Sequence, residues 1–260
     1  MAISLIDEPN LGSLKPIYSP SLAPESSQTE SLIQALSLLP HIEGGYFSQT
    51  DEAPTTIPSP YPEDPLSAET ISLSGGPRPG FDAALRRLST TIFYLLTHRR
   101  PLGRFHRNRS RIIHTLHRGR GRYVLLHPDG RVETFVVGHA VERGEKLQWV
   151  VEGGVWKASY LLDTDDNENN LKEPQGLLIS ETVVPGFEFA DHEFLSERRL
   201  GEMLPKEQAV ALAWLSKKNT DSKQITDSSE ESDTPDANVG EPIVISVTAV
   251  EVKNEQLKEN

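Results

Sequence analysis

The stretch RYVLLHPDGRVETFVVG, residues 122–138, consists of two apolar runs separated by a short polar turn. Both runs are rich in β-branched and aromatic residues, which are enriched in β-strands. Between them stands Pro128-Asp129-Gly130, in which proline presets φ and glycine supplies the positive φ of a tight turn. The stretch therefore predicts an antiparallel β-hairpin.

Similar short runs lie on both sides of this hairpin, from about residue 89 to about residue 190. They are STTIFYLLT, RIIHTLH, LQWVVEGG, VWKASYLL and GLLISETVVPGFEF. Many short strands with frequent turns and little helix are typical of an antiparallel sandwich or barrel. We therefore expect a mainly β fold for this region.

Helical patterns are confined to the two sides of the β region. Ser27 and Glu30 have capping-box spacing, leucines follow at helical period, and Pro40 is expected to end this first helix. After Phe189, SERRLGEML and PKEQAVALAWLSKK predict one or two helices, with Pro205 at a first-turn position. The β core is thus expected to carry short N- and C-terminal helices.

Composition divides the chain into four parts. Residues 1–25 are rich in proline and serine and are expected to form an irregular tail. Residues 26–217 are expected to form one domain, in which residues 51–80 and 163–175 are loop inserts. Residues 218–242 are expected to form an acidic disordered linker, and residues 243–260 a short apolar β segment with a charged tail. The apolar run at 243–250 is expected either to add an edge strand to the barrel or to be unrelated to it, and the edge strand is favoured.

The chain is acidic, with 38 Asp and Glu against 26 Lys and Arg and a net charge of −12. Nucleic acids and anionic membranes bind positive surfaces, so neither is expected as a partner. The absence of cysteine excludes disulfides and thiolate chemistry. The N-terminus lacks the pattern of a secretory signal and no apolar run is long enough to span a bilayer. We therefore expect a cytoplasmic location, with the nucleus left open.

The positive charge is concentrated in one window. Residues 86–123 hold eleven arginines and no Asp or Glu, so the rest of the chain carries 15 − 38 = −23. The window lacks the interleaved aromatic residues of a platform for single-stranded nucleic acid. Two interpretations stay open: the arginines pair with acidic residues or solvent, or some of them help to bind a carboxylate or phosphate.

Four phrases occur in a characteristic order: HIEGGYF at 41–47, TTIFYLL at 90–96, LHPDGRVETFVVG at 126–138 and VVPGFEFADHEFL at 183–195. Over roughly residues 31–217 the chain resembles the cupin-like family of unassigned function whose members carry HPEGGYF and VAPGFDFADFEL phrases. The resemblance implies a double-stranded β-helix, the cupin jelly-roll barrel, similar to the sugar-nucleotide epimerase branch of cupins. It also implies a homodimer.

The resemblance allows a test for a metal centre. Cupins that hold a metal use a His-x-His pair, an acid about four residues on, and a last histidine from a second motif. His106 matches the first ligand, but Asn108 and Ile112 occupy the next two positions, and Lys157 stands in place of the last histidine. Only one of the four ligands is present, and a lysine ammonium would repel a cation. We therefore expect no metal and no other cofactor.

Alternate residues of a strand share a face, which divides residues 106–116 into two sets. In the cupin register the even-numbered set, which begins with His106, faces the interior of the barrel. A one-residue slip would reverse the two sets. The odd-numbered set, expected outside, contains Arg107, Arg109 and Arg111.

His106, His114 and Lys157 are candidates for catalysis, the histidines as bases and the lysine as a stabiliser of negative charge. Glu181 is an acid in an apolar strand, and next to His114 or Lys157 it would complete an acid/base pair. His41 and Glu43 of HIEGGYF are considered as contributors to the pocket, and Glu43 equally suits a role in fixing the Gly-Gly bend. The candidate ligand-binding residues are Asn108, Ser110, Arg111, Trp156, Glu181 and Glu43, although a tryptophan is more often a core residue.

The sequence thus predicts a metal-independent cupin-like protein that binds a small anionic molecule resembling a sugar nucleotide or an organic acid. If it catalyses a reaction, proton transfer of the isomerase or epimerase type suits both the resemblance and the residues. The alternative is a non-catalytic scaffold or protein-interaction module. An apolar, filled barrel interior would favour that alternative, whereas titratable groups that converge on one place would favour an enzyme.

Overall fold

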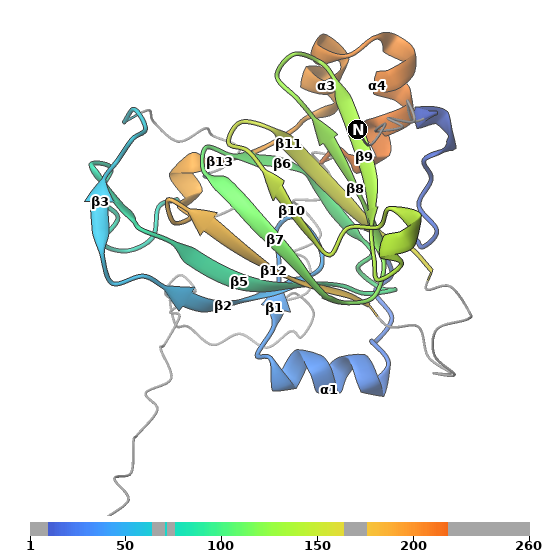
Figure 1. The fold of residues 1–260 in the computed structure, drawn as a ribbon, viewed down its shortest axis with the longest axis horizontal. Helices are drawn as coiled ribbons and strands as arrows, with labels where there is room; N and C mark the ends of the chain where they lie inside the picture. The colour runs from blue at the N-terminus through green and yellow to red at the C-terminus, as the bar shows by residue number, and fades with distance from the viewer. Residues whose placement is uncertain (1–9, 64–70, 72–75, 164–175, 218–260) are drawn as a thin grey trace, which may run out of the picture.

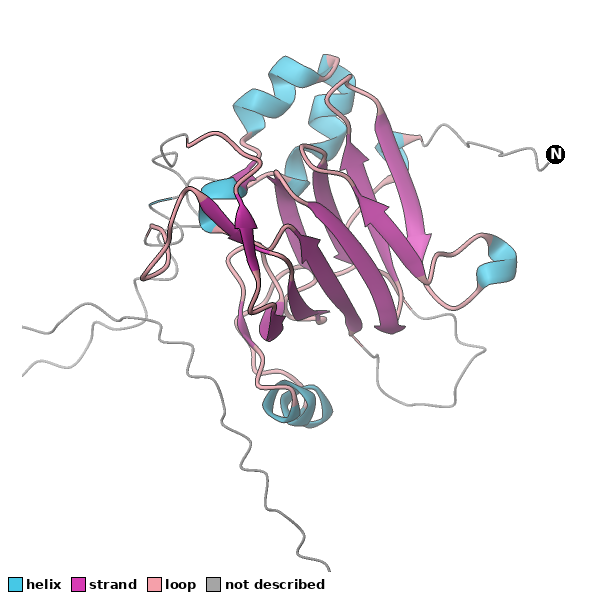
Figure 2. Cartoon of the chain, turned by 60° about the vertical axis from the view of Figure 1, so that its left-hand side comes forward, coloured by secondary structure: helices cyan, strands magenta, loops and turns pink. Residues whose placement is uncertain are grey.

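The computed structural model describes residues 10–63, 71, 76–163 and 176–217 of the chain. Two antiparallel sheets face each other, with short helices on their outer sides (Figures 1 and 2). The mainly β jelly-roll fold predicted from the sequence is confirmed. The segments 218–242 and 243–260, and all but the first residue of the insert at 163–175, lie outside the described residues.

The larger sheet has six strands, in the order β1 (Leu39–Pro40), β2 (Tyr46–Glu52), β5 (Thr90–Leu96), β12 (Leu177–Val184), β7 (Arg111–Arg118) and β10 (Gln148–Val151). The smaller sheet has five, in the order β13 (His192–Phe194), β6 (Leu102–Asn108), β11 (Trp156–Leu161), β8 (Gly121–Leu126) and β9 (Val132–Val137). A separate two-stranded ribbon is formed by β3 (Thr56–Pro58) and β4 (Leu85–Arg87).

Strands β8 and β9 form the predicted hairpin. Their pairing closes at Leu126 and Val132, and Gly130 in the turn has a φ of 83°, a conformation that glycine adopts without steric cost. The register sends Tyr123 and Leu125 into the space between the two sheets and Leu126 to the opposite face. The antiparallel hairpin predicted for residues 122–138 is therefore present.

Both faces of the smaller sheet are buried. Its inner face contributes to the core between the sheets, with residues such as Tyr123 and Leu161. Its outer face is covered by α3 (Glu197–Met203) and α4 (Lys206–Leu212), which supply Leu200 and Leu212 to a second core (Figure 1). The remaining helix, α1 (Ser27–Ala35), packs on the outer face of the larger sheet. Single 3-10 turns lie at Leu11–Ser13, Val141–Arg143, Phe189–Asp191 and Ala213–Leu215.

Two details of the N-terminal region differ from the sequence expectation. Leu11 and Leu14 are buried in the outer core, so these two residues of the irregular N-terminal segment pack against the domain. The helix α1 is capped by Ser26, whose hydroxyl accepts a hydrogen bond from the Thr29 amide, one residue before the predicted cap. The helix itself lies where its leucine pattern predicts it.

Candidate functional site

Burial along β6 and β7 follows the two sets predicted from the sequence. The even-numbered residues are buried, and they are His106, Asn108, Ser110, Ile112, His114 and Leu116. On the other face the side chain of Arg111 is 54% exposed and lies 3.2 Å from Glu152. The predicted register is therefore correct, and the row that begins with His106 lines the barrel interior.

Lys157 reaches across the space between the sheets. It lies on β11 of the smaller sheet, whereas His114 and Glu181 are paired neighbours on β7 and β12 of the larger sheet. The Lys157 ammonium is 2.5 Å from the Glu181 carboxylate and 2.9 Å from Nε2 of His114, and all three side chains are buried. We call these three residues the Lys157 cluster.

A second group of titratable side chains surrounds Glu43. The Glu43 carboxyl oxygens lie 3.2 Å from Nε2 of His106, 3.5 Å from Nδ1 of His41 and 3.6 Å from Nδ1 of His192. His192 also lies 3.1 Å from the amide oxygen of Asn108. We call Glu43 and the three histidines the Glu43 cluster.

The HIEGGYF phrase places Glu43 at the barrel wall through its backbone. The Glu43 carbonyl accepts a hydrogen bond of 2.7 Å from the Arg104 amide on β6. The next residue, Gly44, has a φ of 114°, and a Cβ added there would lie 1.9 Å from the Leu102 carbonyl oxygen. Only glycine permits this approach, so the Gly-Gly bend holds the Glu43 carboxyl inside the barrel.

The two clusters are neighbours. Lys157 and His106 are directly paired residues of β11 and β6, and His192 and Asn108 are directly paired residues of β13 and β6. The Glu43 carboxyl therefore lies beside β6, and β6 is the direct neighbour of β11, which carries Lys157. Together the clusters form one polar region within the barrel interior.

This polar region lies toward one end of the barrel, which we call the polar end. Lys157 and Asn108 are next to corners that join the two sheets there. Backbone hydrogen bonds tie these corners together, because Gly154 donates to the Asn108 carbonyl at 2.8 Å and Arg109 donates to the Asp191 carbonyl at 3.0 Å. The strand ends at the opposite end are apolar, with the fully buried Leu96, Leu161 and Leu177.

The proton positions in the Lys157 cluster follow from its geometry. Burial alone would raise the pKa of Glu181, but the Lys157 ammonium and His114 hold that pKa well below its ordinary value. Burial and the neighbouring ammonium lower the pKa of His114, so its ring is neutral at neutral pH. An ammonium can only donate hydrogen bonds, so Nε2 of His114 accepts and the ring proton is on Nδ1.

In the Glu43 cluster the carboxyl group is neutral, whereas in the Lys157 cluster it is ionised. Burial raises the pKa of Glu43 to about 8, so this carboxyl is protonated at neutral pH. Burial also lowers the pKa of His106 well below its ordinary value. Nδ1 of His106 donates to the Arg104 carbonyl at 2.8 Å, since a carbonyl can only accept, and Nε2 is left without a proton. A carboxylic acid thus faces an unprotonated imidazole nitrogen.

The structure brings most of the candidate residues together. His106, Asn108, His114, Lys157, Glu181 and Glu43 all belong to or touch the two clusters. Ser110 lies at the corner beyond Asn108, where its hydroxyl accepts a hydrogen bond from Tyr61.

Arg111 and Trp156 are not brought to the polar region. Arg111 belongs to the outward set and pairs with Glu152. Trp156 directly precedes Lys157, so the pleat of β11 sends the two side chains to opposite faces. It is buried under the C-terminal helices, with the Arg107 guanidinium 4.5 Å above its ring.

Sequence reasoning considered His41 next to Glu43 as a contributor to the pocket and His192 as a structural or rim residue, but it placed neither among the candidate site residues. Both lie within the phrases that carry the family resemblance, HIEGGYF and VVPGFEFADHEFL. Their position in these phrases is the signal that could have found them. Burial lowers the pKa of His41 to about 4 and that of His192 to about 3, so both rings are neutral at neutral pH.

The polar region is a poor match for a metal centre. Among the described residues, no group of three or more His, Asp or Glu side chains is arranged to hold a metal ion. The imidazoles of His41, His106 and His192 approach the Glu43 carboxyl itself. Lys157 adds an ammonium beside them, which a divalent cation would have to displace.

We predict that Glu43 makes stability fall as the pH rises from 6.5 to 8. The pKa of Glu43 is about 8 in the folded chain against 4.5 for an exposed glutamate, so its stabilisation is complete below pH 4.5 and is lost as the pH rises through 8. The free energy of unfolding should fall by up to about 1.4 kcal/mol per pH unit. His41 and His192 act in a different pH range. Their pKa values are lowered from 6.5, so they make stability fall as the pH drops below 6.5.

The measurement is urea unfolding at pH 6.5, 7.2 and 8.0. Glu43→Gln should remove most of the slope, whereas Glu152→Gln, at an exposed surface pair, should keep it. An unchanged slope in Glu43→Gln would show that Glu43 is not the group that titrates.

No helix among the described residues is long and apolar enough to cross a membrane.

The chain is 45% identical over 190 residues to an uncharacterized protein, YML079W, of Saccharomyces cerevisiae, a match that covers 73% of this chain and 86% of the yeast protein. Two solved structures, each 24% identical, share the fold. A hypothetical protein from Leishmania major has a TM-score of 0.55 and protein SO0799 from Shewanella oneidensis has one of 0.53, and each match covers 73% of this chain and 98% of the other.

The family resemblance seen in the phrases is matched by a family model. The model described as Cupin superfamily (DUF985) matches residues 30–195, and this range contains every member of both clusters. The chain therefore belongs to the DUF985 family of the cupin superfamily.

Proposed function

We propose that the polar end of the barrel binds a small anionic molecule without the help of a metal. The observation that carries this proposal is the buried Lys157 ammonium, which lies between Glu181 and His114. A ligand carboxylate or phosphate can take over part of the pairing that Glu181 provides. The neighbouring Glu43 cluster adds hydrogen-bonding groups but no further negative charge at neutral pH, because the Glu43 carboxyl is protonated.

The same region supports proton transfer of the isomerase or epimerase type. Nε2 of His106 can accept a proton from a carbon acid, and the Glu43 carboxyl can return one to the resulting carbanion. A proton then passes from His106 to Glu43 and restores the starting state. Lys157 would stabilise the negative charge that develops between the two transfers. His114 is less suited as the base, because the Lys157 ammonium occupies its Nε2.

Ligand binding is tested by thermal unfolding of the full chain with organic acids, sugar nucleotides, inorganic phosphate and divalent metal chlorides, all at one ionic strength. An anion present at one hundred times its Kd should stabilise the fold by about 2.7 kcal/mol. This corresponds to a rise in Tm of several degrees for a domain of this size. Stabilisation by metal chlorides alone, or by no anion, would contradict the proposal.

Two variants distinguish anion binding at the Lys157 cluster from anion binding to lysines at the protein surface. Lys157→Met should abolish the shift in Tm that the best anion produces, measured against the same variant without anion. Lys146→Met removes a partly exposed lysine that lies 3.6 Å from Glu133, and it should leave the shift unchanged. Equal shifts in both variants would place the binding site elsewhere.

The second candidate function is a non-catalytic scaffold. It is favoured by one observation, that Lys157 already has partners in Glu181 and His114 and needs no ligand. Exchange of a carbon-bound hydrogen of the best-binding organic acid with D2O, followed by NMR, distinguishes the two. Exchange that Glu43→Gln abolishes supports the enzyme, and binding without exchange supports the scaffold.

The homodimer implied by the family resemblance is also a proposal, which sedimentation of the same samples would test.

A further inference from the structure

The polar end of the barrel is covered by a segment that the sequence identifies only as part of a loop insert. Residues 54–63, which we call the strap, contain β3 and then turn toward the corner between β6 and β7. Figure 1 shows the β3–β4 ribbon at the end of the barrel where β12 ends and β13 begins. The strap therefore lies at the end that holds the two clusters.

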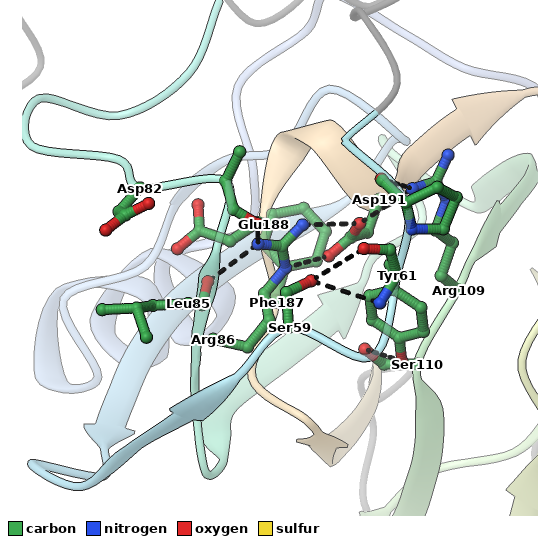
Figure 3. Close-up of polar contacts among 12 residues, drawn as sticks. Ser59, Tyr61, Asp82, Leu85, Arg86, Arg109, Ser110, Phe187, Glu188 and Asp191 are labelled. Atoms are coloured by element: carbon green, nitrogen blue, oxygen red, sulfur yellow. Dashed lines mark hydrogen bonds and ion pairs between the residues drawn. The ribbon is translucent and has the colours of Figure 1, made fainter.

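One side chain of the strap makes the contact with the site. The Tyr61 hydroxyl donates to the Ser110 hydroxyl at 3.1 Å, and Figure 3 shows the Tyr61 ring lying next to Ser110. Ser110 stands in the same inward row as Asn108 and His106, one step nearer the end of the barrel. It is only 2% exposed although it lies at a corner, so Tyr61 covers the outer end of this row.

The two parts of the covering segment are held very differently. On β4, Arg86 donates two hydrogen bonds to the Asp191 carboxylate, at 2.7 and 3.1 Å, and both side chains are buried. This ion pair fixes the ribbon to the corner before β13 (Figure 3). Tyr61 is only half-buried, and its hydroxyl contact with Ser110 joins two neutral groups. The centre of its ring lies 5.8 Å from the guanidinium carbon of Arg86, a contact that involves no hydrogen bond. A neutral hydrogen bond at a half-buried position breaks far more easily than a buried bidentate ion pair.

We propose that the Tyr61 side chain is the gate of the polar end, and that it limits entry to molecules about the size of a small organic acid. The ribbon stays in place, and rotation of one phenol side chain away from Ser110 opens the path to the row of Asn108 and His106. An opening made by a single side chain admits a small carboxylate, whereas a sugar nucleotide would require the ribbon itself to move. This inference rests on the proposed function, because it names the size class of the ligand.

Access to the interior can be measured without knowing the ligand. Trp149 is buried and stacks on His114, with ring centroids 5.0 Å apart and planes 12° apart, so its fluorescence reports on the Lys157 cluster. Trp156→Phe and Trp214→Phe leave Trp149 as the single tryptophan of the full chain. Quenching by acrylamide, a small neutral molecule, and by iodide, a small anion, then measures entry.

Tyr61→Ala should raise the quenching constant of Trp149 several-fold for both quenchers, and Tyr61→Phe should raise it less, because the ring stays in place. Leu85→Ala removes an exposed side chain from the same ribbon and should change nothing. Unchanged quenching in Tyr61→Ala, or an equal rise in Leu85→Ala, would overturn the gate.

The gate and the proposed function can fail separately. If Tyr61→Ala raises quenching but no anion stabilises the protein, the gate stands and the proposed ligand is wrong. If organic acids bind and Tyr61→Ala leaves quenching unchanged, the ligand stands and the gate is overturned. Should the two Phe substitutions prevent folding, 5-fluorotryptophan is incorporated into the otherwise unsubstituted chain. Broadening of the Trp149 19F resonance by a soluble nitroxide then decides between the same two outcomes.

Discussion

Lys157→Met is expected to lower the free energy of unfolding at pH 7 by about 3–5 kcal/mol, because it leaves the Glu181 carboxylate buried without its cation. Glu181 lies in the barrel interior, and Lys157, at 2.5 Å, is its nearest charged partner. In the parent chain His114 is neutral at this pH, so Lys157 carries the positive charge next to Glu181. Urea unfolding of the variant and the parent chain gives the difference directly.

The pH dependence of this loss has a definite sign. In the parent chain the pKa of Glu181 is held well below its ordinary value, so the stabilisation it contributes is present above an unfolded pKa of about 4.5 and is lost as the pH falls. Without Lys157, burial raises the pKa of Glu181, and the group takes up a proton on folding. The difference between variant and parent should therefore shrink as the pH is lowered from 7 to 4.5.

The double variant Lys157→Met/Glu181→Leu separates the ion pair from packing. A buried ion pair can be replaced by apolar residues at little or no cost, so the double variant should recover most of the stability that Lys157→Met loses. Lys146→Met, at a partly exposed pair with Glu133, should cost less than about 1 kcal/mol. A double variant as unstable as Lys157→Met would mean that the lysine stem, and not its charge, holds the interior together.

The sequence predicts the barrel well because its strands alternate over short distances. The hairpin at 122–138 follows from a period of two and one turn, and the inward row from His106 to Leu116 follows from the same period together with the cupin register that the resemblance implies; both are confirmed. The same rule predicts that His114 faces inward and that His117 faces outward. Local pattern is sufficient there because each prediction concerns neighbours within one or two strands.

The rule fails where a strand is buried on both faces. Trp156 and Lys157 are both buried, so no alternation of polar and apolar residues distinguishes the inner face of β11 from the outer one. The helices that cover Trp156 lie about forty or more residues further along the chain, as the bounds of α3 show. Leu11 and Leu14 raise a similar difficulty, because two leucines in a segment rich in proline and serine carry no periodic signal.

The strap shows the limit most clearly. Tyr61 contacts Ser110 across 49 positions of sequence, and Arg86 contacts Asp191 across 105. Neither Tyr61 nor Asp191 lies in a repeating pattern, and the window of eleven arginines does not single out Arg86 from its neighbours. The excess of positive charge there was a real signal of ion pairing, but only the three-dimensional fold shows that the acid next to Arg86 is Asp191.

Arg86→Met is the second substitution expected to have a large effect, with a loss of about 3–5 kcal/mol in the free energy of unfolding. It leaves the Asp191 carboxylate buried, with the Arg109 guanidinium at 3.8 Å as the nearest remaining cation. Asp191→Asn should cost less, because the Arg86 guanidinium keeps its hydrogen bonds to the Ala83 and Leu85 carbonyls. Urea unfolding of both variants tests this order.

The size of the loss also reports how the strap is joined to the barrel. If the β3–β4 ribbon can detach by itself, Asp191 becomes hydrated and the global loss falls short of 3 kcal/mol, while amide exchange at Arg86–Leu88 becomes fast. If the ribbon and the barrel unfold together, the full loss appears and those amides stay protected. Arg198→Met, at an exposed helix pair with Glu202, is the matched control and should cost no more than about 0.5 kcal/mol. A loss in Arg86→Met no larger than this control would mean that the buried Arg86–Asp191 pair does not stabilise the fold, and that the strap is held at the polar end by Tyr61 and its neighbours instead.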